Sequence, residues 1–290
     1  MSSFLEKATS SMPSEFAHAM RSAELALAMT LLPPGARVLE LGAGDGWQAS
    51  ILEQHGFLVK AVDIADPTTC DTQYAHVVTY DGKTIPFPDG SFDAVFSSNV
   101  LEHVKDFDCT QAELARILTN EGIAVHCVPS SIWRIWTTLG HPLYAIRWLR
   151  NLHRRDLTAT TQSAARLASA KSSRGGVLRL LRLGLIAPKH GESGNLMSEH
   201  LLFSRRTWKR RFEQSGWIVV SEHPTNLFYS GNEIFGLRLA GRTRNMLAKV
   251  LGSSTRIFVL KPAHMDSSPL HALAGTEPSC TSRHSPNHKT

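Results

Sequence analysis

The chain has 290 residues, of which 42% are hydrophobic and 19% are charged, and its formal net charge is +6 at pH 7. This composition is that of an ordinary folded protein, which excludes a chain that is disordered throughout. The start of the sequence has no basic segment followed by an apolar core, and no apolar stretch approaches the roughly 18 residues that span a bilayer. We therefore expect a cytoplasmic protein.

The first predicted element is a helix over residues 14–32, which ends at Pro33, Pro34 and Gly35. Short apolar segments then alternate with helical patterns, which is typical of a parallel sheet with helices on both faces. The strands expected in this part are residues 37–41, 57–64, 75–81, 92–99 and 123–129. The helices expected between them include residues 47–56 and 109–122, each closed by a glycine.

The pattern changes after Pro129. Residues 131–190 contain eleven basic residues and one acidic residue, whereas the rest of the chain has 20 basic and 24 acidic residues. All of the basic excess therefore lies in one insertion-like stretch, which begins with interleaved aromatic residues and arginines. Regular elements resume with a helix over 204–216, a strand over 217–223, a short helix near 242–251 and a strand over 255–262.

The sequence VLELGAGDGWQ places three glycines directly after the first expected strand. Gly42, Gly44 and Gly46 permit a sharp turn and a close approach of a ligand to the backbone. Asp63 ends the second strand, where an acid accepts hydrogen bonds from ribose hydroxyls in nucleotide-type cofactor sites. These residues by themselves are consistent with a dinucleotide or with another adenosine-bearing ligand.

Two neighbouring residues favour a cationic ligand. Trp47 stands where the dinucleotide fingerprint requires its third glycine. Glu40 precedes the first glycine by two positions, and its charge would repel a pyrophosphate but suits a sulfonium or an ammonium group.

Three ordered motifs, VLELGAGDGWQ, VDI and YDGKTIPFPDGSFDAVFSSNVLEHVKD, resemble the class I S-adenosylmethionine-dependent methyltransferases of the small-molecule type. The resemblance covers residues 36–129, and a weaker resemblance to the same family is present in SEHLLFSRRTWKRRFEQSGW. It implies an α/β Rossmann-like fold with a seven-stranded, mostly parallel sheet, an antiparallel strand seven and a helical insertion after strand five. The expected parts are a helical cap, a cofactor-binding core, a basic aromatic acceptor-binding or lid insertion, the C-terminal part of the same sheet and a disordered tail. These parts are residues 1–35, 36–129, 130–200, 201–262 and 263–290.

The cofactor implied by the resemblance is S-adenosyl-L-methionine. The residues implied to bind it are Glu40, Gly42, Gly44, Gly46, Asp63, Ile64, Asp81, Gly82 and Asn99. The three glycines, Glu40 and Asn99 are implied at the methionine end, and Asp63 at the ribose. Ile64 is implied against the adenine, whose amino edge would meet Asp81 and the glycine that follows it. A plain turn is the alternative for Asp81, and a helix N-cap is the alternative for Asn99.

The predicted activity is methyl transfer to a small-molecule, glycan or lipid-linked acceptor, preferably at oxygen. A hydroxyl acceptor needs a general base, and the candidates are His103, His190 and His200. Each histidine has a structural alternative as a surface or capping residue, and no motif selects one of them. The four cysteines lie far apart without the C-x-x-C spacing of a zinc site, so no metal is expected.

Three interpretations of residues 131–190 stay open. They form an amphipathic cap with solvated arginines, an element that touches an anionic membrane at its cytoplasmic face, or a site for RNA or another polyanion. The sequence SSNVLEH differs from the Asx-Pro-Pro-aromatic loop of enzymes that methylate exocyclic amines of bases, which disfavours nucleic acid. A non-catalytic module that binds the cofactor at a membrane surface is the alternative to an enzyme.

Overall fold

The computed structural model describes residues 14–64, 74–140, 196–229 and 241–263. Seven strands of these residues form one sheet in the order β3-β2-β1-β4-β5-β7-β6. They are β1 (Arg37–Leu41), β2 (Leu58–Ile64), β3 (Val77–Tyr80), β4 (Phe92–Ser98), β5 (Leu118–Pro129), β6 (Trp217–Pro224) and β7 (Thr255–Pro262). The pairs among β1 to β5 are parallel, and β7 is antiparallel to both β5 and β6. The expected sheet with an antiparallel seventh strand is confirmed.

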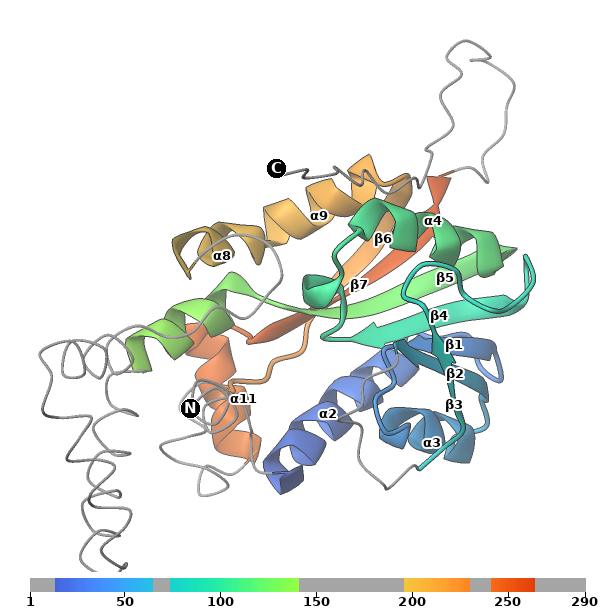
Figure 1. Ribbon diagram of the computed structural model, residues 1–290. Helices are drawn as coiled ribbons and strands as arrows, with labels where there is room; N and C mark the ends of the chain where they lie inside the picture. The colour runs from blue at the N-terminus through green and yellow to red at the C-terminus, as the bar shows by residue number, and fades with distance from the viewer. Residues whose placement is uncertain (1–13, 65–73, 141–195, 230–240, 264–290) are drawn as a thin grey trace, which may run out of the picture.

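Helices cover both faces of the sheet (Figure 1). They include α2 (Ser14–Met29), α3 (Trp47–Gln54), η1 (Leu101–His103), α4 (Phe107–Ile117), α8 (Leu196–Leu202), α9 (Arg205–Gln214) and α11 (Gly241–Leu251). Residues 131–140 after β5 are also helical and are called helix 131–140 below. α2, α3 and α11 lie on one face, and α4 and α9 lie on the other. Among the described helices, none is long and apolar enough to cross a membrane.

The two cores follow from the alternation of side chains along each strand. Ala94 of β4 packs in a cluster with Leu25 of α2, whereas Val95 packs in a cluster with Leu114 and Trp208 on the opposite side. Successive strand residues point to opposite faces, so consecutive buried apolar residues in a central strand need a helix layer on each side. The apolar residues Ala94, Val95 and Phe96 of β4 are all fully buried, which accounts for the three-layer arrangement.

The predicted helix over residues 109–122 is wrong at its C-terminal end. α4 ends at Ile117, and Leu118 is already extended and begins β5, where it pairs with Phe92. Burial of Leu118 against the sheet outweighs its helical propensity. Gly122 lies inside β5, where a Cβ would be 2.9 Å from the carbonyl oxygen of Thr119, so this glycine marks a close backbone approach.

The remaining differences are small shifts of element ends, such as β3 at Val77–Tyr80 instead of residues 75–81, and changes in helices outside the alternating part of the chain. The first helix ends at Met29 rather than at residue 32, and α8 was not predicted. Most of the predicted insertion and the predicted disordered tail lie outside the described residues.

A buried carboxylate ties α2 to the far end of the chain. Glu24 has no solvent exposure and accepts hydrogen bonds from the hydroxyls of Tyr229 and Thr255. The backbone amide of Tyr229 in turn donates to Oγ of Ser254 at 2.8 Å. The first helix is therefore fixed against β7 and the segment after β6, although these segments are more than 200 residues apart.

Replacing Tyr229 with phenylalanine should lower the free energy of unfolding by about 1–3 kcal/mol, because Glu24 then keeps a desolvated oxygen with one donor fewer. Urea unfolding followed by fluorescence measures the change. Tyr74→Phe, at an exposed tyrosine, is the matched control and should leave the unfolding midpoint unchanged. Equal effects of the two substitutions would contradict a stabilising role of the Glu24 contact.

Candidate active site

The candidate site lies where parallel strands end together. β1 pairs in parallel with β2 and with β4, so their carboxyl ends meet at one edge of the sheet. This edge faces helix 131–140 and η1 (Figure 1). Open α/β sheets bind ligands outside the carboxyl ends of their strands, and the predicted cofactor residues lie in the last residues of β1 and β2 or just after β1, β3 and β4.

The turn after β1 requires glycine because of its backbone conformation. Gly42, Gly44 and Gly46 have φ angles of 72°, 57° and 77°, in the left-handed region that other residues rarely adopt. A Cβ on Gly42 would lie 2.4 Å from Cγ2 of Val100, whereas a Cβ on Gly44 would meet no atom within 4 Å apart from its chain neighbours. The turn is thus pressed against the segment after β4 at Gly42 and has open space at Gly44.

Asp63 at the end of β2 is joined to this turn. Its Oδ2 accepts a hydrogen bond from the amide of Gly44 at 2.5 Å, and its Oδ1 accepts one from the amide of Ile64 at 2.7 Å. Ile64 is exposed, and a Cβ on Gly82 would lie 3.2 Å from Cγ2 of Ile64. A carboxylate has lone pairs for further donors. The carboxylate, an exposed apolar side chain and the turn after β3 therefore lie next to one another.

Glu40 is the acid placed deepest in the site, with 2% of its surface exposed. Desolvation raises its pKa to about 8, and the charges of Asp45 and Asp63 add to the rise, while the backbone of Ala49 and the charge of Arg21 oppose it. Its Oε2 is buried and has no hydrogen-bond partner in the described part of the chain. A desolvated carboxyl with an unused oxygen fits a cationic ligand such as an ammonium or a sulfonium group.

α2 contributes two residues that the sequence reasoning did not assign to the site. Nη1 of Arg21 donates to the carbonyl oxygen and to Oγ of Ser98, at 2.8 and 2.7 Å. The ring of His18 stacks on Trp47, with 4.5 Å between the centroids and 6° between the planes. The helical period of α2 indicates which face is buried, but it carries no signal for the sheet edge that the helix covers.

Asn99 follows β4 in a left-handed conformation, with φ of 54°. Its backbone amide donates to the carbonyl oxygen of Cys127 at 2.8 Å, and its side-chain Nδ2 donates to Oγ of Ser98 at 3.2 Å. The N-cap residue of η1 is Val100, so the capping alternative for Asn99 is wrong. The β4 and β5 ends are thereby held together beside the glycine turn.

The three candidate bases differ in position. His103 lies in η1, close after β4, with 45% of its side chain exposed and its Nε2 3.9 Å from Oε1 of the buried Glu102. His200 lies on α8, half-buried, and its Nδ1 has no hydrogen-bond partner among the described residues. His190 lies outside the described residues. No group of three metal-ligating side chains occurs in the described ranges.

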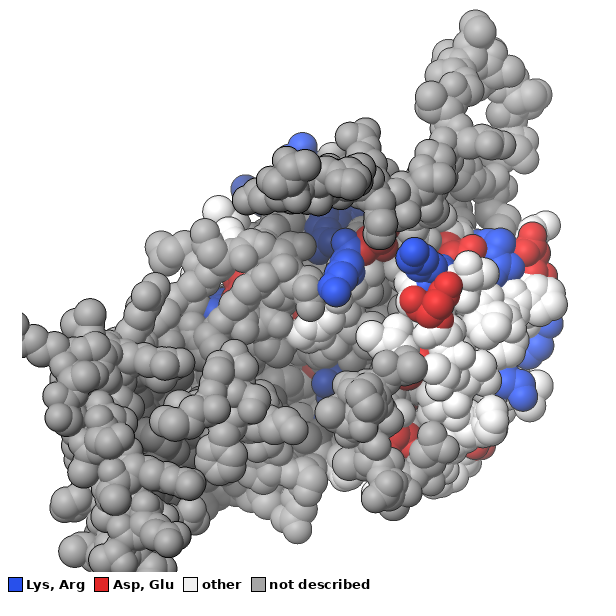
Figure 2. Space-filling model, in the orientation of Figure 1, with Lys and Arg blue, Asp and Glu red and all other residues white. Residues whose placement is uncertain are grey.

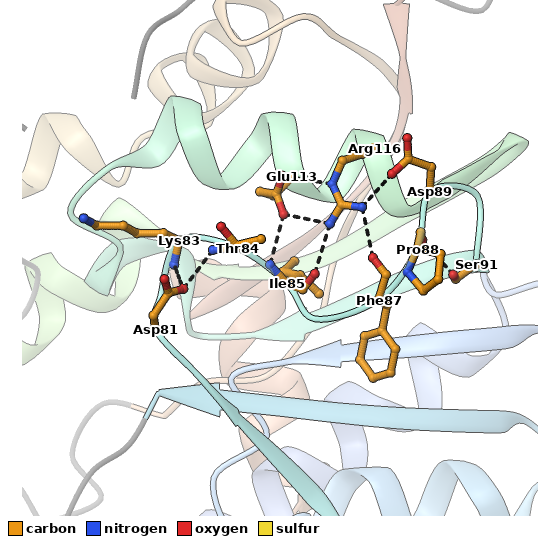
Figure 3. Close-up of polar contacts among 10 residues, drawn as sticks. All are labelled: Asp81, Lys83, Thr84, Ile85, Phe87, Pro88, Asp89, Ser91, Glu113 and Arg116. Atoms are coloured by element: carbon orange, nitrogen blue, oxygen red, sulfur yellow. Dashed lines mark hydrogen bonds and ion pairs between the residues drawn. The ribbon is translucent and has the colours of Figure 1, made fainter. Parts of the chain in front are cut away.

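Arg116 of α4 fixes the loop between β3 and β4 (Figure 3). Nε and Nη2 donate to the two carboxylate oxygens of Glu113, both at 2.9 Å. Nη2 also donates to the carbonyl of Ile85 at 3.0 Å, and Nη1 donates to the carbonyl of Phe87 at 2.9 Å and to Asp89 at 2.7 Å. The guanidinium has five N–H donors, and each of them has an acceptor here. Glu113 completes the clamp by accepting the amide of Ile85 at 3.0 Å.

The same loop begins with a compact turn at Asp81. Its Oδ1 accepts the amides of Lys83 and Thr84, both at 2.8 Å. These bonds lower the pKa of the Asp81 carboxyl, with the bond from Thr84 contributing most. The turn and the Arg116 clamp adjoin along the chain (Figure 3), and together they hold Asp81 and Gly82 beside Ile64.

Surface charge around this half of the molecule is mixed. Figure 2 shows described basic and acidic side chains next to each other, with uncharged surface between them. Examples of such pairs are Arg37 with Asp93 and Arg116 with Asp89, each at 2.7 Å. The described part of the face in Figure 2 therefore has no extended surface of one sign, which a polyanion would need.

Replacing Arg116 with lysine should weaken binding of S-adenosylhomocysteine about tenfold, because a single ammonium cannot keep the fork of bonds to Glu113 and the loop carbonyls. Calorimetric titration measures the affinity, and Arg37→Lys at an exposed pair is the matched control. Once a methyl acceptor is identified, the KM of the Arg116→Lys variant for the methyl donor should rise while its kcat stays within a factor of about two. Unchanged affinity in the folded Arg116 variant would show that the clamp does not position the site.

Residues 14–222 of the chain match the methyltransferase domain family. A 2-methyl-6-phytyl-1,4-hydroquinone methyltransferase of Synechocystis sp. is 34% identical over 119 residues, which are 38% of this chain and 36% of that protein. A demethylmenaquinone methyltransferase of Corynebacterium efficiens is 36% identical over 88 residues, which are 30% of this chain and 38% of that protein. The chain thus spans less than half of the length of these curated relatives.

A solved S-adenosylmethionine dependent methyltransferase from Mesorhizobium loti gives a TM-score of 0.45 at 15% identity, covering 82% of this chain and 97% of that one. The family match extends over more than half of the chain, and the order of the seven strands is that of the class I fold. The chain therefore belongs to the methyltransferase domain family.

Proposed function

We propose that the protein transfers a methyl group from S-adenosyl-L-methionine to a hydroxyl oxygen of a lipid-linked small molecule. The observation that carries the cofactor part is the buried Glu40 carboxyl with its unused oxygen beside the open turn at Gly44. The lipid-linked character of the acceptor is supported by two relatives, whose names give a phytyl hydroquinone and a demethylmenaquinone, and transfer at oxygen is the part of the proposal that the histidine variants below test. A glycan or another small molecule is the second choice of acceptor.

The proposed cofactor residues are those of the four strand ends. Glu40, with the glycines of the turn, meets the ammonium and the charged sulfur, and Asn99 faces the same end. Asp63 accepts the ribose hydroxyls with the lone pairs that Gly44 and Ile64 leave free. Ile64 packs on the adenine, and Asp81 with Gly82 meets the amino edge of the base. The contact between Ile64 and Gly82 supports a single continuous adenine site.

The bound cofactor supplies a methyl group on a positively charged sulfur. Transfer at oxygen forms the new C–O bond, breaks the C–S bond and leaves a neutral thioether, while the hydroxyl proton passes to a base. The residues mainly align the reacting atoms and exclude water. Among the candidate bases, His103 is supported by its half-exposed position in η1, directly after β4. His200 and His190 are the alternatives.

Aromatic side chains at the start of the insertion support an apolar acceptor. Trp133 packs against Met20 and Tyr229, and Trp136 lies edge-to-face with Phe228 at 6.0 Å between ring centroids. These contacts join helix 131–140 to α2 and to the segment after β6. Aromatic rings arranged at the carboxyl ends of the strands suit a ring-bearing acceptor.

Replacing Asp63 with alanine should weaken S-adenosylhomocysteine binding at least about tenfold, because the ribose loses a charged acceptor. Calorimetric titration with NAD as a control ligand tests the prediction. Asp93→Ala, at the start of β4 and at the opposite end of the strands, removes a carboxylate elsewhere and should leave the affinity unchanged. No binding by the folded wild type would contradict the cofactor assignment.

The same titration, combined with a turnover assay on each variant, separates cofactor binding from catalysis. Alanine at His103, His190 or His200 should preserve cofactor affinity, and loss of turnover in one variant identifies the base. Turnover that persists in all three variants would contradict a histidine base and favour transfer to carbon or nitrogen, which does not require one.

Binding of the cofactor product should strengthen as the pH rises from 6 to 8. Glu40 is largely protonated below its pKa of about 8 in the free protein, and a bound cation favours the ionised form, so a proton is released on binding. Linkage then gives up to about a tenfold gain in affinity per pH unit below that pKa, with a plateau above it. Titrations at pH 6, 7 and 8 measure the slope.

Two variants identify the group responsible for this pH dependence. Glu40→Gln should bind more weakly and lose the slope, and Glu53→Gln, at an exposed acid of α3, should keep it. An unchanged slope in Glu40→Gln would assign the released proton to another group.

A further inference from the structure

α11 presents apolar side chains to solvent. Met246 and Val250 are one helical turn apart, and 69% and 83% of their surfaces are exposed. Arg242, one turn before Met246, and Lys249, next to Val250, are also exposed. Residues four apart are neighbours on a helix surface, so Arg242, Met246 and Val250 form one row with Lys249 at its side.

Helix 131–140 lies beside α11 and has a similar row (Figure 1). Ile135 and Leu139 are one turn apart, and Leu139 is 61% exposed. The two helices are held together by a hydrogen bond from Nε1 of Trp136 to the carbonyl of Leu251 at 3.2 Å. Ile132 also packs so closely on Gly252 that a Cβ there would lie 2.9 Å away. The two exposed rows thus belong to one rigidly packed pair of helices.

The charge of this helix pair is positive. The sequence contains no acidic residue between residues 129 and 155 or between residues 241 and 263. Arg134 is buried and forms an ion pair with Glu199 of α8 at 2.9 Å, and Arg244 is buried and donates to the carbonyl of Phe228. The exposed cations Arg242 and Lys249 therefore act without neighbouring acids on their own segments.

We propose that the exposed rows of α11 and helix 131–140 bind the surface of a bilayer that contains anionic phospholipid. Exposed apolar side chains flanked by cations are the arrangement of interfacial helices, whose apolar atoms enter the acyl boundary while the cations meet lipid phosphates. The proposal joins helix 131–140 and α11 in one surface, although α11 begins about 100 residues after that helix ends along the sequence. The proposal rests on the proposed function in one respect, because a lipid-linked acceptor would enter the active site from the membrane that these helices contact.

Vesicle sedimentation of the full chain tests the proposal. The protein should sediment with vesicles of equal parts phosphatidylcholine and phosphatidylglycerol, and at least about tenfold less with phosphatidylcholine alone. The double variant Met246→Glu with Val250→Glu should lose at least about tenfold in partitioning, because the apolar contact is lost and like charges repel the lipid. Leu58→Glu, at a 65% exposed leucine that begins β2, is the matched control and should partition like the wild type.

The outcomes separate the membrane surface from the methyltransferase site. S-adenosylhomocysteine affinity should stay unchanged in the double variant, which also shows that it folds. Wild-type protein that stays in the supernatant with the mixed vesicles, or a double variant that sediments as well as the wild type, would overturn the proposal. A wild-type dimer that the double variant converts to a monomer would also overturn it, since the rows would then bind a second copy of the chain.

Discussion

The turn after β1 is the constraint on which both the fold and the site depend. It has no room for a side chain at Gly42, where Val100 of the segment after β4 presses on it, or at Gly46, where a Cβ would lie 3.0 Å from the backbone of Ala75. The backbone amide of Gly44, between these two glycines, donates a hydrogen bond to the carboxylate of Asp63. The ends of β1, β2 and β4 and the segment before β3 are therefore brought together by one short stretch of backbone.

Burial of carboxyl groups around this turn gives the site its electrostatic character. Desolvation raises the pKa of Glu40 and of Glu102 to about 8, so at neutral pH the free protein mostly buries neutral acids. An uncompensated buried charge would be far more costly to the native state. Since these acids have ordinary pKa values when unfolded, their contribution to native stability is present at low pH and is lost as the pH rises towards 8. The proposed cation of the cofactor would favour the ionised form of Glu40.

Local patterns in the sequence predicted what local chemistry determines. The bounds of β1 and β7 were predicted correctly, because a short apolar run between turn residues indicates a strand. The glycine turn and the position of Asp63 at the end of a strand were predicted because each depends on residue types within one short segment of the chain. Arg21, the Glu24 contact to Tyr229 and the Arg116 clamp could not be recognised in this way. Their partners lie 77, 205 and up to 31 residues away, and only the folded sheet brings them together.

The two halves of the molecule differ in how they are built. The part around the turn after β1 depends on glycines at positive φ, whereas helix 131–140, α8 and α11 are joined by side-chain contacts. One such contact matters more than the others, since the buried pair of Arg134 and Glu199 joins the residues that lead into and out of the insertion. Losing one partner would leave a buried charge, a cost of about 3–5 kcal/mol. Substitution of Arg134 or Glu199 is therefore more disruptive to the fold than substitution of the exposed residues of helix 131–140.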